Sequence, residues 1–237
     1  YGSMVDHPAT VLPTVANGET QAIALHAFEK IVLRNNGLLV PGADSTVDLA
    51  SVACEGGGTL ELRSATGVTL NQGLTVSGYT LSVGVPLTVP GNLTIAADGV
   101  LTHPLNYNAD TWTLDLTVTG DMTVATGGSL DAMMRGYRPL TGPGAGNRSA
   151  PSQGGSHGGL GGLRSTELPT AKHVAYGSVL SPAASGSGAQ DARGGGVVNL
   201  TVNGVLTVDG SVTAMGHSTN GEGGGSGGSL DIGAAAI

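Results

Sequence analysis

The sequence contains very little of several residue types that usually stabilise a small domain. Cysteine occurs once, at Cys54, so no disulfide can form within the chain. Aromatic residues make up 3% of the chain, with one phenylalanine and one tryptophan, so a core has to be built from valine, leucine, isoleucine and alanine. The chain also lacks a run of about 18 apolar residues, so no membrane-spanning helix is expected.

Glycine, in contrast, is abundant. The chain holds 42 glycines in 237 residues, well above the usual share of roughly 7%. Hydrophobic residues still make up 39%, which argues against a solvated low-complexity chain. The glycines show no Gly-X-Y period, which excludes a collagen helix. A narrow, stacked β architecture fits this composition.

Internal repeats give the clearest signal in the chain. LTVPGNLTIAADGVLT at 87–102 aligns with LTVTGDMTVATGGSLD at 116–131. LTVNGVLTVDGSVTA at 200–214 repeats the pattern with two residues removed before its second glycine. A looser copy begins with the same Leu-Thr-Val at 74–83, and 31–42 is a degenerate one. Such repeats indicate units that bury their apolar faces by stacking on one another.

Each repeat alternates apolar and polar residues and then turns at Asn-Gly, Asp-Gly or Gly-Gly. This alternation is typical of strands, and these dipeptides supply the positive φ that tight turns require. We therefore expect an all-β fold, a parallel β-helix (β-solenoid); a β-sandwich is the alternative. The residues expected to face inward occupy matching positions in three repeats: Leu87, Val89, Leu93, Ile95, Leu116, Val118, Met122, Val124, Leu200, Val202, Leu206 and Val208.

A segment at 132–196, rich in glycine, serine, proline and alanine, interrupts the repeats and includes GGSHGGLGG at 154–162. Two interpretations are open: a flexible loop, or a loop packed on the stem, where glycine permits close backbone approach. A phosphate-binding loop is disfavoured because no Gly-Lys-Ser/Thr leads into a helix. The expected organisation is a cloning remnant at 1–4, N-terminal solenoid coils at 5–131, the packed glycine-rich basic insert at 132–196, and truncated C-terminal coils at 197–237 that continue into the parent chain.

The glycine-rich motifs follow a definite order: RGYRPLTGPGAGN (135–147), GGSHGGLGG (154–162), AYGSVLSP (175–182), the glycines of 186–196, and GGGSGGSLDI (223–232). Over roughly 95–232 this order resembles the glycine-rich β-helical repeat region of large bacterial surface and secreted proteins. The chain departs from that pattern at 139–141, which reads Pro-Leu-Thr, and at 186–190. The resemblance implies an extracellular solenoid and brings no known catalytic set.

Charge is distributed unevenly along the chain. The insert at 132–196 holds six of the nine basic residues and two of the seventeen acids, so it carries +4 and the remainder −12. A positive loop on a negative stem favours an anionic polysaccharide or cell-surface glycan. Nucleic acid is not expected, because the acidic stem would repel a long duplex. The alternative is that the arginines bind carbonyl groups of the glycine loops or form surface ion pairs.

The insert also holds the candidate ligand-binding residues. His157 and His173 could act with Asp191 as a base or metal site, although the spacing H-x-x-x-H is missing and loop histidines bonded to backbone are the alternative. Tyr137 and Tyr176 could stack on sugar rings or anchor the glycine loops. The full candidate set is Arg135, Tyr137, Arg138, His157, Arg164, Lys172, His173, Tyr176, Asp191 and Arg193.

Acidic residues recur at the predicted turns, where an aspartate caps its own backbone. Calcium between adjacent turns is the alternative, but the nine-residue Gly-Gly-x-Gly-x-Asp repeat is missing, so no cofactor is expected. These acids are Asp98, Asp121, Asp131, Asp209, Glu222 and Asp231.

Two classes of function remain. The first is a non-catalytic structural or adhesive module of the cell surface, whose insert contacts an anionic glycan. The second is a β-helical polysaccharide lyase or hydrolase, which needs a base with neutralising groups or a carboxylate pair; a viral tailspike segment would share the fold. No nucleophile–base pair, metal cluster or carboxylate pair is evident from spacing, so the sequence favours the first class.

Overall fold

The regular secondary structure of the chain consists mainly of short parallel strands. The computed structural model describes residues 4–6, 21–23, 30–42, 46–63, 67–146, 153–162, 174–218 and 223–237. Within these residues the one helical element is a 3-10 turn, η1 (Leu49–Ser51), and no helix long and apolar enough to cross a membrane is present. The expectation of an all-β fold is confirmed.

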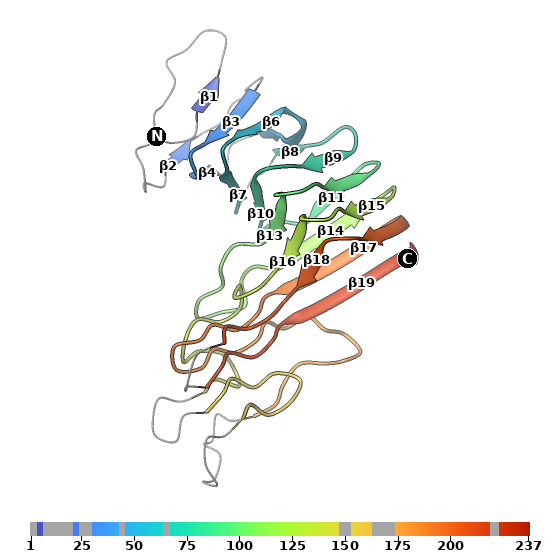
Figure 1. Cartoon of the computed structure of the whole chain (residues 1–237). Helices are drawn as coiled ribbons and strands as arrows, with labels where there is room; N and C mark the ends of the chain where they lie inside the picture. Colours follow the sequence, from blue (N-terminus) through green and yellow to red (C-terminus); the bar gives the residue numbers. More distant parts are fainter. Residues whose placement is uncertain are drawn as a thin grey trace.

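Two large sheets contain most of the strands (Figure 1). The first is β2 (Gln21–Ile23), β4 (Gly37–Pro41), β7 (Gly58–Leu62), β10 (Thr80–Val83), β13 (Val100–Thr102), β16 (Ser129–Asp131) and β18 (Ser211–Thr213). The second is β9 (Leu74–Val76), β12 (Leu93–Ile95), β15 (Met122–Val124), β11 (Leu87–Val89), β14 (Leu114–Val118), β17 (Val197–Val208) and β19 (Ser229–Ala236).

Two smaller sheets lie in the N-terminal part of the chain. One contains β1 (Met4–Asp6), β3 (Lys30–Arg34) and β6 (Val52–Glu55), and the other pairs β5 (Thr46–Asp48) with β8 (Gly67–Thr69). The β1–β3 pair is antiparallel, and the other strand pairs of the described residues are parallel.

The strand register follows the sequence repeats. Leu87 pairs with Leu116 and Leu93 with Met122, the same offset as in the aligned segments 87–102 and 116–131. These pairs belong to two ladders, one through β11 and β14 and the other through β12 and β15. The third repeat continues both through β17, whose first half pairs with β14 and whose second half pairs with β15. The two-residue deletion before its second glycine lies between β17 and β18, where the chain turns from one sheet to the next.

One repeat is shifted relative to the expected alignment. The Leu-Thr-Val at 74–76 pairs with 93–95, the second strand of the next repeat, and not with its first strand at 87–89. The expected alignment of this looser copy is therefore wrong by one strand. The reason is that the Leu-Thr pair begins strands of both ladders, so the motif by itself does not reveal which ladder a strand joins.

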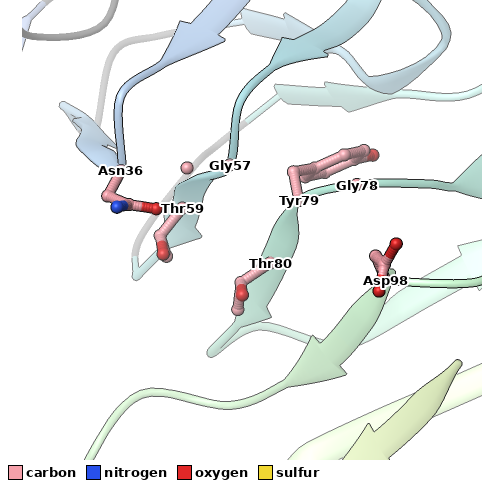
Figure 2. A pocket seen from close by; sticks show the side chains of 8 residues that line it. Asn36, Gly57, Thr59, Gly78, Tyr79, Thr80 and Asp98 are labelled. Atoms are coloured by element: carbon pink, nitrogen blue, oxygen red, sulfur yellow. The ribbon is translucent and has the colours of Figure 1, made fainter. Parts of the chain in front are cut away.

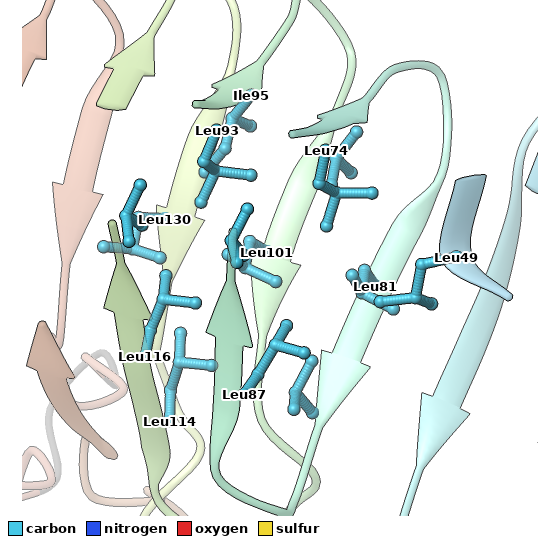
Figure 3. Packing of buried hydrophobic residues seen from close by; sticks show 14 of the residues in the cluster. Leu49, Leu74, Leu81, Leu87, Leu93, Ile95, Leu101, Leu114, Leu116 and Leu130 are labelled. Carbon is cyan, nitrogen blue, oxygen red and sulfur yellow. The ribbon is translucent and has the colours of Figure 1, made fainter. Parts of the chain in front are cut away.

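The core runs along the inside of the stacked strands. Leucine, valine and isoleucine from successive strands pack against one another there (Figure 3). Eleven of the twelve residues expected to face inward are buried. The exception is Val208, which is 43% exposed. Val208 is the last residue of β17, and it pairs with Val124 of β15 but with no residue of β19.

Residues with a left-handed backbone conformation (positive φ) occupy the turns that lead into strands of the first sheet. Asn36, Asp98 and Gly127 have φ of 57°, 60° and 82°, and each precedes a glycine. The Asn-Gly, Asp-Gly and Gly-Gly turns expected from the sequence are thus present at these positions. These turns stack directly: the Asp98 N–H donates to the Gly127 carbonyl at 3.1 Å, and the Asn36 N–H to the Gly57 carbonyl at 3.1 Å.

Candidate functional site

Three long connections follow strands of the first sheet and precede strands of the second. They run from β13 to β14, from β16 to β17, and from β18 to β19. Because these strands are paired in parallel, the three connections leave at the same edge and extend away from the strands together (Figure 1). We call their described residues the glycine-rich corner: 103–113, 132–146, 153–162, 174–196, 214–218 and 223–228.

Backbone segments approach one another closely in this corner. A Cβ atom on Gly194 would lie 1.7 Å from the Gly186 carbonyl oxygen, which no side chain allows. The amides in these segments are also paired: the Gly186 N–H donates to the Gly195 carbonyl at 2.8 Å, and the Gly194 N–H to the Tyr137 carbonyl at 2.9 Å. Glycine here permits packing of one backbone on another.

The stretch 154–162 is divided between a packed part and an exposed part. The Gly155 N–H donates to the Gly224 carbonyl at 2.9 Å, and a Cβ on Gly155 would lie 2.3 Å from the Ser187 carbonyl oxygen. Residues 158–160 are exposed. Its described backbone is therefore joined to other loops of the corner through Gly155.

Arg193 uses its guanidinium inside the corner. Its Nε donates to the Met134 carbonyl at 2.9 Å, and its Nη2 donates to the carbonyls of Gly136, at 3.1 Å, and Asn106. Burial lowers the pKa of Arg193, with the nearby Arg135 and Arg138 acting in the same direction. The Arg193 side chain thus joins the connections 103–113 and 132–146. This agrees with the alternative that the arginines bind carbonyl groups of the loops.

Tyr176 and His157 likewise bond to the corner. The Tyr176 hydroxyl donates to the Ser185 carbonyl at 2.5 Å and lies 2.8 Å from the Ser187 hydroxyl. Burial raises the pKa of Tyr176 to about 12. The Nδ1 of His157 lies 2.9 Å from the Gly227 carbonyl, so this nitrogen carries the proton. The ring centroids of His157 and Tyr176 are 4.9 Å apart.

Two side chains that sequence reasoning missed join the connection 103–113 to the end of the insert. The carboxylate of Asp110 accepts from the Ser185 N–H at 2.7 Å and from the Ser185 hydroxyl at 2.5 Å. Buried Asn106 donates from Nδ2 to the Ser185 hydroxyl at 3.2 Å, and its Oδ1 accepts from the N–H groups of Thr111 and Trp112 at 2.9 and 2.7 Å. Neither lies in the insert, so the composition of the insert gave no reason to consider them.

The remaining candidates differ in their surroundings. Arg135 is half-buried, and burial lowers its pKa while the charges of Asp131 and Glu61 raise it. Tyr137 is also half-buried, and burial raises its pKa. Arg138 and Asp191 are exposed. The other three candidates, Arg164, Lys172 and His173, lie outside the described residues.

The described residues hold no group of three or more histidine, cysteine, aspartate and glutamate side chains placed to bind a metal. A depression of about 180 Å³ lies elsewhere, over the left-handed turns at the opposite end of the first sheet's strands. Its lining carries one carboxylate, Asp98, and no basic group (Figure 2). Tyr79 lines it as well, but its phenol is buried and burial raises its pKa. The depression therefore shares no residue with the candidate set.

No family model, curated protein or solved structure matches the chain.

Proposed function

We propose that the chain is a non-catalytic structural or adhesive module of the cell surface or the extracellular space. In this proposal a β-solenoid stem gives reach, and the glycine-rich corner is a folded head that contacts an anionic glycan. The extracellular location rests on the resemblance of the motif order over 95–232 to bacterial surface proteins.

The solenoid part of the proposal is supported by the order of strands along the chain. Three consecutive strands, β10, β11 and β12, pair in parallel with the next three, β13, β14 and β15, in the same order. The chain thus returns to the same row of paired strands after three strands. A chain that coils in this way stacks each repeat on its neighbours and buries one continuous core. Such an architecture is elongated and suits a stalk.

One observation carries the non-catalytic part: where the polar groups of the corner point. Arg193, Tyr176 and His157 all bond to backbone carbonyl groups of neighbouring loops. The donors of Arg193 and Tyr176 used in this way hold the loops in place, and the Nδ1–H of His157 orients its ring while Nε2 stays a proton acceptor. A lyase or hydrolase needs a second acid or a neutralising group beside such a base. These residues therefore support the shape of the head.

The charge of the insert supports an anionic ligand. A glycan array at two salt concentrations, combined with a size analysis of the recovered polymers, tests the proposal. We expect retention of uronic-acid polymers that weakens as salt rises, because exposed charges are screened over about 8–10 Å near physiological ionic strength. The chain length of the polymer should not change. Shortened polymer would contradict the non-catalytic part, and retention that ignores salt would contradict the electrostatic part.

A further inference from the structure

Tyr107 leaves most of its side chain in solvent although the loops around it are packed. It is 59% exposed, whereas Tyr137 and Tyr176 in the same corner are half-buried. An exposed aromatic ring is unusual in a chain with 3% aromatic residues. Tyr107 lies in the connection 103–113, outside the insert, and was not among the candidates.

The ring of Tyr107 is held from one side by Arg193. The Cζ atom of Arg193 lies 5.4 Å from the ring centroid, within the range of a cation–π contact. Because the donors of Arg193 are bonded to carbonyl groups of Met134, Gly136 and Asn106, its guanidinium is fixed beneath the ring. Arg193 thus positions the aromatic surface and leaves ligand charge to another residue.

Arg138 is placed to supply that charge. The backbone N–H of Arg138 donates to the backbone carbonyl of Tyr107 at 3.1 Å. The side chains of Arg138 and Tyr107 therefore start from neighbouring points of the backbone. The hydroxyl of Thr141 fixes this arrangement, because it lies 3.0 Å from the Tyr107 carbonyl and 2.8 Å from the Arg138 carbonyl. Arg138 is exposed, and among the described residues its guanidinium has no ion-pair or hydrogen-bond partner.

We infer that Tyr107 and Arg138 form a subsite for one uronic-acid residue of a polysaccharide, an inference that rests on the proposed function. The apolar face of the pyranose ring stacks on Tyr107, and the carboxylate binds the guanidinium of Arg138. A tyrosine offers a large, rigid contact area at small entropic cost, and an arginine binds a carboxylate through two parallel hydrogen bonds. A neutral sugar makes only the first of these contacts.

The test compares binding of polygalacturonate and neutral dextran to the whole chain and to four variants. Tyr107→Ala removes the stacking surface, and Tyr107→Phe keeps it. Arg138→Gln removes the charge. Leu180→Ala is the matched control, because Leu180 is a 98% exposed residue of the same corner that the inference does not use. Calorimetric titration gives the dissociation constants, and circular dichroism shows that each variant is folded.

The wild type should bind polygalacturonate more tightly than dextran. Tyr107→Ala and Arg138→Gln should each weaken polygalacturonate binding about fivefold or more, while Tyr107→Phe and Leu180→Ala stay within about twofold of the wild type. If Tyr107→Ala and Arg138→Gln both bind polygalacturonate with the dissociation constant of the wild type, the subsite is overturned and the proposed function still stands. A wild type that binds no polygalacturonate would overturn the anionic-glycan part of the proposed function and the subsite with it.

Discussion

The imidazole of His103 accepts a hydrogen bond at 3.1 Å from the backbone N–H of Val197, the first residue of β17. The other ring nitrogen, Nδ1, lies 2.8 Å from the Pro104 carbonyl and therefore carries the proton. His103 is fully buried, and burial lowers its pKa to about 4, with Arg135 acting in the same direction. A neutral histidine thus fixes the point at which the chain returns from the insert to the stacked strands.

This contact predicts that acid destabilises the fold. Between pH 6.5 and about 4 the unfolded chain binds a proton at this histidine and the folded chain does not, so the free energy of unfolding falls as the pH falls. The loss due to His103 should approach about 3 kcal/mol below pH 4. Urea unfolding of the wild type and of His103→Gln between pH 7 and 4 isolates it, because the other five histidines are common to both. Parallel pH profiles would contradict the prediction.

The hydroxyl of Tyr176 should contribute to stability. Tyr176→Phe leaves the Ser185 carbonyl without this donor and should lower the free energy of unfolding by about 1–2 kcal/mol. Tyr107→Phe is the matched control, because its hydroxyl has no hydrogen-bond partner among the described residues and its removal should cost less than about 0.5 kcal/mol. Equal losses measured by urea unfolding would show that Tyr176 does not anchor the corner.

Two glycines of the stretch 154–162 should respond differently to a methyl group. Gly155→Ala places a Cβ 2.3 Å from the Ser187 carbonyl oxygen and should destabilise the fold by about 1–3 kcal/mol. A Cβ on Gly162 would meet no atom within 4 Å, so Gly162→Ala should be nearly neutral. Thermal unfolding of both variants checks this. A flexible linker would tolerate both changes equally.

Buried and exposed positions of the repeats should differ as strongly. Leu93 is fully buried, so Leu93→Ala should cost about 2–5 kcal/mol of unfolding free energy. Val208 is 43% exposed, and Val208→Ala should cost less than about 1 kcal/mol. Urea denaturation gives both values. Similar losses at the two positions would contradict the described packing of the repeats.

The strand positions could be predicted because matching leucines and valines recur at fixed offsets, and these offsets became the strand register. The ladder of 74–76 could not, because Leu-Thr begins strands of both ladders. For Arg193 and Tyr176 the sequence left ligand contact and loop anchoring open, since the choice depends on which carbonyl groups lie within reach. Tyr107 was missed because stacking of the connections, not sequence proximity, brings it beside Arg138.

Amide hydrogen exchange across 184–196 tests most directly whether the glycine-rich corner is a folded head. The N–H groups of Gly186, Gly194 and Gly195 are bonded to the carbonyls of Gly195, Tyr137 and Ser226 at 2.8–2.9 Å. We predict that these amides exchange much more slowly than those of an unfolded chain, at rates comparable to those of the stacked strands. Exchange across 184–196 as fast as in an unfolded peptide, with the strands still protected, would contradict the account.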